Sequence, residues 1–368
     1  MLIFDGDNPL AAVAMHLRRD VTLPLDELRR RDTDDEDIAL SSLPEMRRAG
    51  MAVAIMKVVS DMQREGATIE GANPAYRTYA IGKGQIAWYH ALEAKGELRI
   101  IRTAADLRHH MAAWEAAADD EAARATLPVG TILGLEGADS VQEPEELGEW
   151  WRDGIRLVSI GHYGVSPYGH GTGTGTDGPL LERGPALLRE MDRLGMLLDV
   201  THTSDRSVRE ALAVFKGPLL ATHSNTRALC VGERQLPDDL IQAVIDRDGV
   251  IGASMDTWML WPAGAPDWGT DKWPNNRKYF PRSAVTLDDL VNHMEYVNRM
   301  AGDALHSGIG GDTDGQGGRE CAPADVDTVM DYHRIAGILR RRDYAEADVE
   351  NVMWRNWVRL FERALPAA

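Results

Sequence analysis

Six short apolar segments of the chain end at a histidine or a carboxylate, the side chains that most often bind divalent metals and transfer protons. The segments MLLDVTH and PLLATH end at His202 and His223, and the others end at Asp7, Glu136, His162 and Asp312. Two imidazoles with several carboxylates form a nitrogen and oxygen donor set that suits zinc or a similar divalent ion. An ion held in this way polarises a carbonyl group and lowers the pKa of a bound water to about 7.

The segments that carry these residues alternate with helical patterns. Runs of Val, Ile and Leu without in-and-out alternation are typical of parallel strands that are buried on both faces. Such runs lie near residues 2–4, 51–58, 130–136, 155–162, 196–202, 218–223, 249–255 and 307–312. Amphipathic helical patterns separate them, for example at 186–194, 205–215, 237–248 and 287–300. Eight strand and helix units in series predict an α/β fold, a (β/α)8 TIM barrel, whose strands all end at one mouth.

The length of the chain fits one domain. Barrels of this class reach 368 residues as single units, so we expect 1–368 to form a single domain. The segment 257–285 is rich in Pro and Trp and follows the seventh expected strand, on the side where barrel loops build active sites. We interpret this segment as a lid or a pocket wall.

The composition argues against several classes of partner and location. The formal net charge of −18 repels phosphate backbones and acidic lipid, so we expect neither a nucleic-acid nor a membrane partner. No apolar run approaches the roughly 18 residues that span a bilayer, and the first residues lack the pattern of a signal peptide. Only two cysteines occur, Cys230 and Cys321, which fits a reducing compartment. We therefore expect a cytoplasmic protein.

Each polar strand end has a simpler explanation when it is taken alone. A single histidine after a strand is more often a hydrogen-bonded structural residue than a metal ligand, but six polar strand ends in register favour a common site. The glycine-rich segment 169–178 has no strand feeding it directly and no GK[ST] after it, so we interpret it as a loop and not as a phosphate-binding site. Neither a G-x-S-x-G elbow nor a local signature of a nucleophilic cysteine is present.

Several longer segments make the chain similar to a known family. The segments on which the similarity rests are LGLEGAD (133–139), LVSIGHYGVSPYG (157–169), EMDRLGMLLDVTHTSD (190–205), LLATHSNTRALCVGERQLPDD (219–239) and GIGGDTDG (308–315). On these segments the chain resembles the renal (membrane) dipeptidases, metallopeptidases of the amidohydrolase superfamily. The resemblance implies a (β/α)8 barrel with two zinc ions that cleaves dipeptides, often with a D-residue at the C-terminal position.

The resemblance also implies individual roles for the strand-end residues. Glu136 matches the carboxylate that bridges the two metals, and His202 and His223 match the two imidazoles of one metal. His162 matches the histidine that contacts the substrate and supports the oxyanion. Asp312 matches the carboxylate that acts as acid and base. Together these matches imply that the two imidazoles share one ion.

The start of the chain departs from the family pattern. Family members begin with Asp-Gly-His-Asn-Asp, in which the histidine and the last aspartate bind the other metal. Here the text is DGDNP, so Asp7 replaces the histidine and Pro9 replaces the aspartate. Proline has no side-chain donor, and the Asp7 carboxylate is shorter and harder than an imidazole. We therefore predict one zinc ion on Glu136 and the two imidazoles, and a weak or empty second site to which Asp7 and Asp312 are candidate ligands.

The predicted function is metal-dependent hydrolysis of the amide bond of dipeptides. Arg234, in GERQLPDD, matches the arginine that holds the substrate carboxylate, and a planar guanidinium can do so with two hydrogen bonds. An N-acyl amino acid or a lactam satisfies the same requirement, so another small carboxylate-bearing amide is the alternative substrate. A non-catalytic binding protein is a third hypothesis. Family resemblance also makes a homodimer possible.

Overall fold

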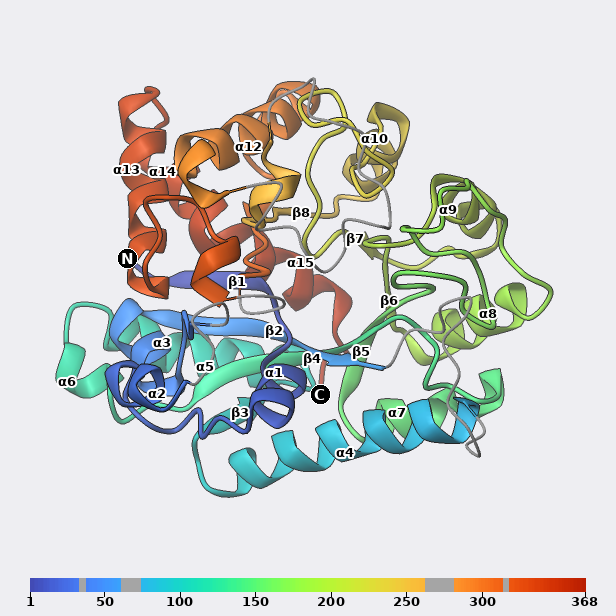
Figure 1. The fold of residues 1–368 in the computed structure, drawn as a ribbon, viewed down its shortest axis with the longest axis horizontal. Helices are drawn as coiled ribbons and strands as arrows, with labels where there is room; N and C mark the ends of the chain where they lie inside the picture. Colours follow the sequence, from blue (N-terminus) through green and yellow to red (C-terminus); the bar gives the residue numbers. More distant parts are fainter. Residues whose placement is uncertain (33–37, 61–73, 262–280, 314–317) are drawn as a thin grey trace.

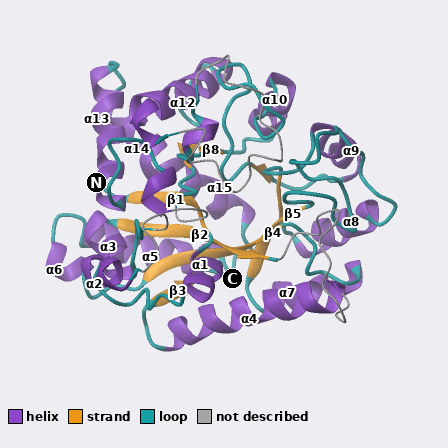
Figure 2. Ribbon diagram, in the orientation of Figure 1, coloured by secondary structure: helices purple, strands orange, loops and turns teal. Residues whose placement is uncertain are grey.

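The computed structural model describes residues 1–32, 38–60, 74–261, 281–313 and 318–368. Parallel strands lie at the centre of the molecule and helices surround them (Figures 1 and 2). The strands follow the order β7-β6-β5-β4-β2-β1-β9-β8, and an isolated parallel bridge from Ala221 to Ile251 joins β7 to β8. The sheet is therefore a nearly closed barrel of eight parallel strands, and the predicted (β/α)8 fold is confirmed.

All eight predicted strands are present, and one strand was missed. The strands are β1 Ile3–Asn8, β2 Met51–Val59, β3 Leu98–Ile100, β4 Val129–Glu136, β5 Ile155–Ser159, β6 Leu197–Asp199, β7 Leu219–Leu220, β8 Ile251–Ala253 and β9 Ser307–Ile309. The missed strand, β3, pairs only with the first residues of β4 and lies outside the barrel order. It is too short for a periodic pattern to distinguish it from a loop.

Helices follow most strands, as the barrel requires. They are α1 Leu10–Leu17, α2 Leu25–Arg31, α3 Leu43–Ala49, α4 Pro74–Ala94, α5 Ala104–Ala116, α6 Glu121–Arg124, α7 Leu147–Arg152, α8 Gly184–Leu194, α9 Asp205–Val214, α10 Asp238–Asp246, α12 Leu287–Ala301, α13 His333–Arg341, α14 Glu346–Glu350 and α15 Asn356–Ala364, with a π-helical turn at Asn351–Arg355 before α15. Ser204 caps α9 through its hydroxyl, and Thr103 and Thr286 form capping boxes at α5 and α12. These caps set where the helices begin relative to the strand ends.

The C-terminal helix fills part of the barrel interior. Trp357 on α15 is fully buried, and its indole Nε1 donates a hydrogen bond to Ile309 O at 3.1 Å. A Cβ added at Gly6, Gly252 or Gly308 would lie 2.6–3.0 Å from this indole. Glycine at these three strand positions therefore gives the ring its space, and the interior is packed and not hollow at this end.

The expected lid lies mostly outside the described residues. Within 257–285 the structure describes 257–261 and 281–285, and its first turn, Thr257–Met259, is buried. The Trp258 indole donates a hydrogen bond to Asp256 Oδ2 at 2.6 Å, so this end of the segment packs onto the strand-end residues. None of the helices in the described part of the chain combines the length and the apolar character that crossing a bilayer requires.

A buried histidine predicts how stability depends on pH. His110 on α5 is almost fully buried, its Nε2 lies 2.8 Å from Ala52 O, and burial lowers its pKa to about 4. In the unfolded chain its pKa is about 6.5, so as the pH falls from 6.5 towards 4 only the unfolded chain takes up this proton. Folding stability from this site is therefore present above pH 6.5 and is lost on acidification.

We expect the advantage of the wild type over His110→Gln to shrink by about 2 kcal/mol between pH 7 and pH 5. Urea unfolding at both pH values, with the same metal content in both proteins, measures the difference. The other histidines are present in both proteins, so their contributions cancel in the difference between the two unfolding free energies. If the difference in unfolding free energy between the two proteins stayed constant with pH, His110 would take up its proton equally well in the folded and the unfolded chain, which would contradict the prediction.

Candidate metal centre

The proposed site residues leave their strands in register. His162, His202, His223 and Asp312 each lie three residues beyond the last residue of β5, β6, β7 and β9, respectively. Glu136 is the last residue of β4. Because parallel strands of a barrel end at the same mouth, these side chains converge there.

Three side chains bring their donor atoms to one point. Glu136 Oε1 lies 3.1 Å from His202 Nε2 and 3.2 Å from His223 Nε2, and the two Nε2 atoms are 2.9 Å apart. All three side chains are at least nine-tenths buried. The two histidines that the sequence analysis assigned to one ion therefore face each other, with the carboxylate oxygen completing a triangle.

These spacings fit the requirements of a divalent ion. Zinc binds nitrogen and oxygen ligands at about 2.0–2.1 Å, so two ligands at a tetrahedral angle lie about 3.3 Å apart. The three atoms are within a few tenths of an ångström of that separation. The donor set of two imidazoles and one carboxylate is also one that catalytic zinc sites use, with a further position left for water. The residues present therefore fit a single divalent metal.

The protonation of the histidines reflects the charge of their surroundings. Burial, together with the positive charge of Arg234, lowers the pKa of His202 well below its usual value, so this imidazole is neutral. Burial alone would lower the pKa of His223, but Asp7 and Asp312 raise it to about 10. Burial would raise the pKa of Glu136, yet the three neighbouring imidazoles hold it well below its usual range. The negative charge of the neighbouring carboxylates thus favours a proton on His223. The same negative charge attracts a metal cation.

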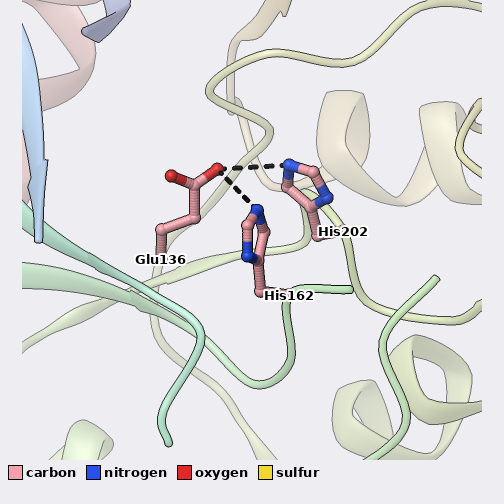
Figure 3. A group of neighbouring side chains, drawn as sticks. All are labelled: Glu136, His162 and His202. Carbon is pink, nitrogen blue, oxygen red and sulfur yellow. Dashed lines mark ion pairs between the residues drawn. The ribbon is translucent and has the colours of Figure 1, made fainter. Parts of the chain in front are cut away.

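His162 approaches the same carboxylate oxygen as His202 does, and the two rings lie next to each other (Figure 3). Its Nε2 lies 3.6 Å from Glu136 Oε1, and its ring lies edge-on to that of His202 at 4.3 Å between centroids. Glu136, His162 and His202 therefore form one group of potential ligands, and Asp7, Glu136 and His223 form a second. Both groups share Glu136, the residue for which the resemblance implied a bridging role.

Asp312 and Arg234 border the triangle. Asp312 Oδ2 lies 3.9 Å from His223 Nε2 and accepts a hydrogen bond from the Ser254 hydroxyl at 3.2 Å. Burial raises the pKa of Asp312. Arg234 is buried; its Nη2 donates to His223 O at 2.7 Å and lies 3.1 Å from His202 Nε2. Both residues therefore lie within reach of a small molecule bound at the triangle.

The first strand places a carboxylate near His223 and a proline beyond it. Asp7 is buried within β1, and its Oδ1 lies 3.1 Å from His223 Nδ1. Pro9 immediately precedes helix α1 and offers no side-chain donor. The DGDNP segment therefore contributes one candidate oxygen ligand where the family pattern has two ligands.

Two buried charges at the site were missed from the sequence. Lys57 on β2 and Asp199 on β6 form an ion pair at 2.6 Å inside the barrel, and both are fully buried. The sequence did contain a signal, because a lysine and an aspartate inside otherwise apolar strands must be paired when they are buried. Tyr163, whose ring lies 4.6 Å from that of His202, carried no comparable signal.

The glycine-rich segment supports two of the histidines. Thr172 N donates to His202 O at 2.7 Å, and Gly171 N donates to Gly164 O at 2.7 Å. A Cβ at Gly171 would lie 1.8 Å from His162 O, an approach that only glycine permits. Residues 169–172 thus hold the backbone after β5 against the backbone after β6.

Comparisons with known proteins identify a family and several proteins to which the chain is similar. The sequence model of a protein family described as "Membrane dipeptidase (Peptidase family M19)" matches residues 2–367. A curated protein named dipeptidase aclJ, from Aspergillus oryzae, is 26% identical over 235 residues, which is 63% of this chain and about half, 51%, of that protein.

Two crystal structures share the fold. One is of a metallopeptidase from Rhodobacter sphaeroides liganded with a phosphinate mimic of the dipeptide L-Ala-D-Ala. It has a TM-score of 0.74 and 21% identity, and the match covers 99% of each chain. Another, of dipeptidase AC, a metallopeptidase of family M19, has a TM-score of 0.75 and 22% identity over 100% of this chain and 99% of the other. At these identities the two structures establish the common barrel.

The close backbone approach at Gly171 gives a testable prediction. Gly171→Ala must displace the backbone of His162, so we expect destabilisation by roughly 1–3 kcal/mol, the usual cost of overpacking, and weaker metal binding. Thermal unfolding and metal titration measure the two effects. Gly84→Ala on α4, where the nearest atom to an added Cβ is 4.0 Å away, is the matched control and should leave both unchanged or slightly raise stability. Equal behaviour of the two variants would contradict the supporting role of this segment.

Proposed function

The chain belongs to the membrane dipeptidase family, peptidase family M19, and on this basis we propose that it is a metal-dependent dipeptidase. The observation that carries the proposal is the triangle of Glu136 Oε1, His202 Nε2 and His223 Nε2, whose sides measure 2.9–3.2 Å. A divalent ion bound there would supply a water of lowered pKa and would polarise the amide carbonyl of the substrate. Zinc is the metal we propose, because this donor set suits it.

Two further residues are proposed to act on the reacting atoms. His162 is mostly buried and neutral, since burial lowers its pKa to about 4, and a neutral imidazole can donate a hydrogen bond to the developing oxyanion. Asp312 has its carboxylate held by Ser254 at the edge of the triangle, where it can accept a proton from the attacking water and deliver it to the leaving amine.

Arg234 is proposed to bind the carboxylate of the substrate. Its Nε is buried and has no hydrogen-bond partner among the described residues, and its guanidinium lies beside the triangle. A buried, permanently charged donor is expected to be paired, and a carboxylate is the group that fits it. A D-residue at the C-terminal position of the dipeptide is part of the proposal, and the dipeptide mimic in the Rhodobacter sphaeroides relative is consistent with it.

Another small amide that carries a carboxylate is the alternative substrate. The Asp7 and Pro9 replacements change the surroundings of the triangle, and Arg234 does not discriminate a dipeptide from an N-acyl amino acid or a lactam. A non-catalytic protein is disfavoured by the three converging ligand atoms of the triangle, which lie 2.9–3.2 Å apart. A cytoplasmic location is supported by Cys230 and Cys321, which form no disulfide bond in the described part of the chain. The partner we propose is a small molecule; a homodimer stays an expectation.

Removal of the metal should abolish the activity. We expect a chelator to eliminate cleavage of a panel of dipeptides with L- and D-residues at the C-terminal position, and zinc to restore it. His202→Asn should lose the metal and the activity together, because one of the three ligands is removed. Asparagine is chosen because residue 202 has a φ of 62°, a conformation that it tolerates better than alanine does. The control His110→Gln changes a buried histidine away from the triangle and should keep both metal and activity.

Asp312→Asn should separate catalysis from metal binding. The substitution preserves size and tolerates the φ of 64° at this position, but it removes the proton acceptor. We expect kcat to fall by roughly 10²–10⁴-fold, the usual contribution of general acid–base catalysis, with the metal content unchanged. Steady-state kinetics and metal analysis on the same preparation test this expectation. Full activity in this variant would eliminate Asp312 as the acid and base.

A further inference from the structure

A lysine side chain lies fully buried inside the barrel beside the candidate metal centre. Lys57 belongs to β2, whose other residues are apolar, and its side chain has no exposed area. Its Nζ lies 2.6 Å from Asp199 Oδ2, 3.0 Å from Thr222 Oγ1 and 3.6 Å from Asp7 Oδ1. Gly134 pairs with Lys57 in the β2–β4 register, and a Cβ there would lie 3.2 Å from Lys57 Cδ. The neighbouring strand therefore leaves room for this side chain.

The hydrogen bonds around Lys57 determine which nitrogen of His223 carries a proton. The Thr222 hydroxyl has one proton, which it donates to Asp199 Oδ2 at 2.7 Å. Thr222 Oγ1 must then accept the hydrogen bonds from Lys57 Nζ at 3.0 Å and from His223 Nδ1 at 3.0 Å. His223 Nδ1 is therefore protonated, and its Nε2 is the nitrogen directed to Glu136.

Asp7 faces the same protonated nitrogen. Its Oδ1 lies 3.1 Å from His223 Nδ1, whereas Glu136 lies 3.2 Å from His223 Nε2. A carboxylate beside the nitrogen that does not bind metal is the usual arrangement behind a histidine ligand, where it orients the ring. Asp7 therefore lies on the side of His223 that faces away from Glu136, where it can support the ring, although it also belongs to the second group of potential ligands.

We infer that the Lys57 ammonium takes the place of a second metal ion, so that the chain binds one divalent ion at Glu136, His202 and His223. Lys57 and Asp7 then act as positioning residues for His223. This inference rests on the proposed function, because it concerns the number of ions in the same site. It assigns to Lys57 a role that the sequence pattern of the site did not include.

Electrostatic repulsion is the physical reason. An ion bound to Asp7 at about 2.0–2.2 Å would lie within about 6 Å of the Lys57 ammonium, and both charges would be buried where screening is weak. The ammonium cannot withdraw without leaving Asp199 buried and unpaired, which is costly. The 2.6 Å contact between Lys57 and Asp199 is an ion pair between two fully buried side chains, so the ammonium charge stays at this place.

The experiment that tests the inference measures the number of metal ions bound per chain in the full-length protein, with and without the charge of Lys57. We expect wild type to hold about one zinc per chain after loading with excess metal and removal of unbound metal, measured by elemental analysis. In Lys57→Met, which keeps the length of the side chain, Asp7 and Asp199 lose their counter-charge, and we expect the stoichiometry to rise to about two. The matched control is Lys83→Met, which removes a lysine that pairs with Asp153 at 2.6 Å on the outside of the barrel, and it should stay near one.

A wild-type count near two, or a folded Lys57→Met that still holds one ion, would overturn the inference. If Lys57→Met does not fold, the second variant is Lys57→Met with Asp199→Asn, which removes both charges of the buried pair; it should also hold more than one ion, and a folded double variant that holds one would overturn the inference. Anomalous diffraction from zinc-soaked wild-type crystals checks the position, since density beside Asp7 would contradict the inference. A wild-type count of zero, in contrast, would reject the proposed function itself.

Discussion

Carboxylates buried inside a barrel require positive charge at the same depth, and this constraint organises the site. Six carboxylates surround the mouth: Asp5, Asp7, Glu136, Asp199, Asp256 and Asp312. Only Lys57 and Arg234 provide permanent positive charge among them in the described structure. The imbalance raises the pKa of Asp5 and of Asp256 well above the usual value, where burial and a neighbouring carboxylate act together. A pocket with this excess of negative charge favours a divalent cation where ligand atoms also converge, and they converge at Glu136.

The placement of residues at strand ends explains how much the sequence could predict. Strands that are buried on both faces leave a continuous apolar run, so all eight barrel strands could be located, and the polar residues at the ends of six of these runs indicated the mouth. The interior charges Lys57 and Asp199 were missed because each occurs alone in an apolar run, and their contact joins strands about 140 residues apart. That pairing depends on which strands become neighbours across the barrel, which no local pattern contains. The roles of the strand-end residues were taken from a resemblance, and their geometry alone does not assign them.

Two of the strand-end residues adopt an unusual backbone conformation. His202 and Asp312 have φ values of 62° and 64°, in the left-handed region that residues other than glycine rarely occupy. One backbone hydrogen bond helps to hold each residue in this conformation: Thr172 N donates to His202 O, and Asp312 N donates to Asp7 O at 3.3 Å. The conformation turns each side chain back over the mouth immediately after its strand. The strand-end register and the left-handed turn together direct these side chains into the site.

The position where Trp357 packs has a consequence for folding during translation. Gly6 lies at the start of the chain, and its closest neighbours include the Trp357 ring, about 350 residues later. At synthesis rates of about 5–20 residues per second, the first strand waits roughly 20–70 s on the ribosome before that ring emerges. Until then the aspartates of β1 lack the strands that enclose them, and the open edge of the sheet is exposed to other nascent chains. The packing of the first strand is therefore expected to be completed only after the last helix of the barrel has been translated.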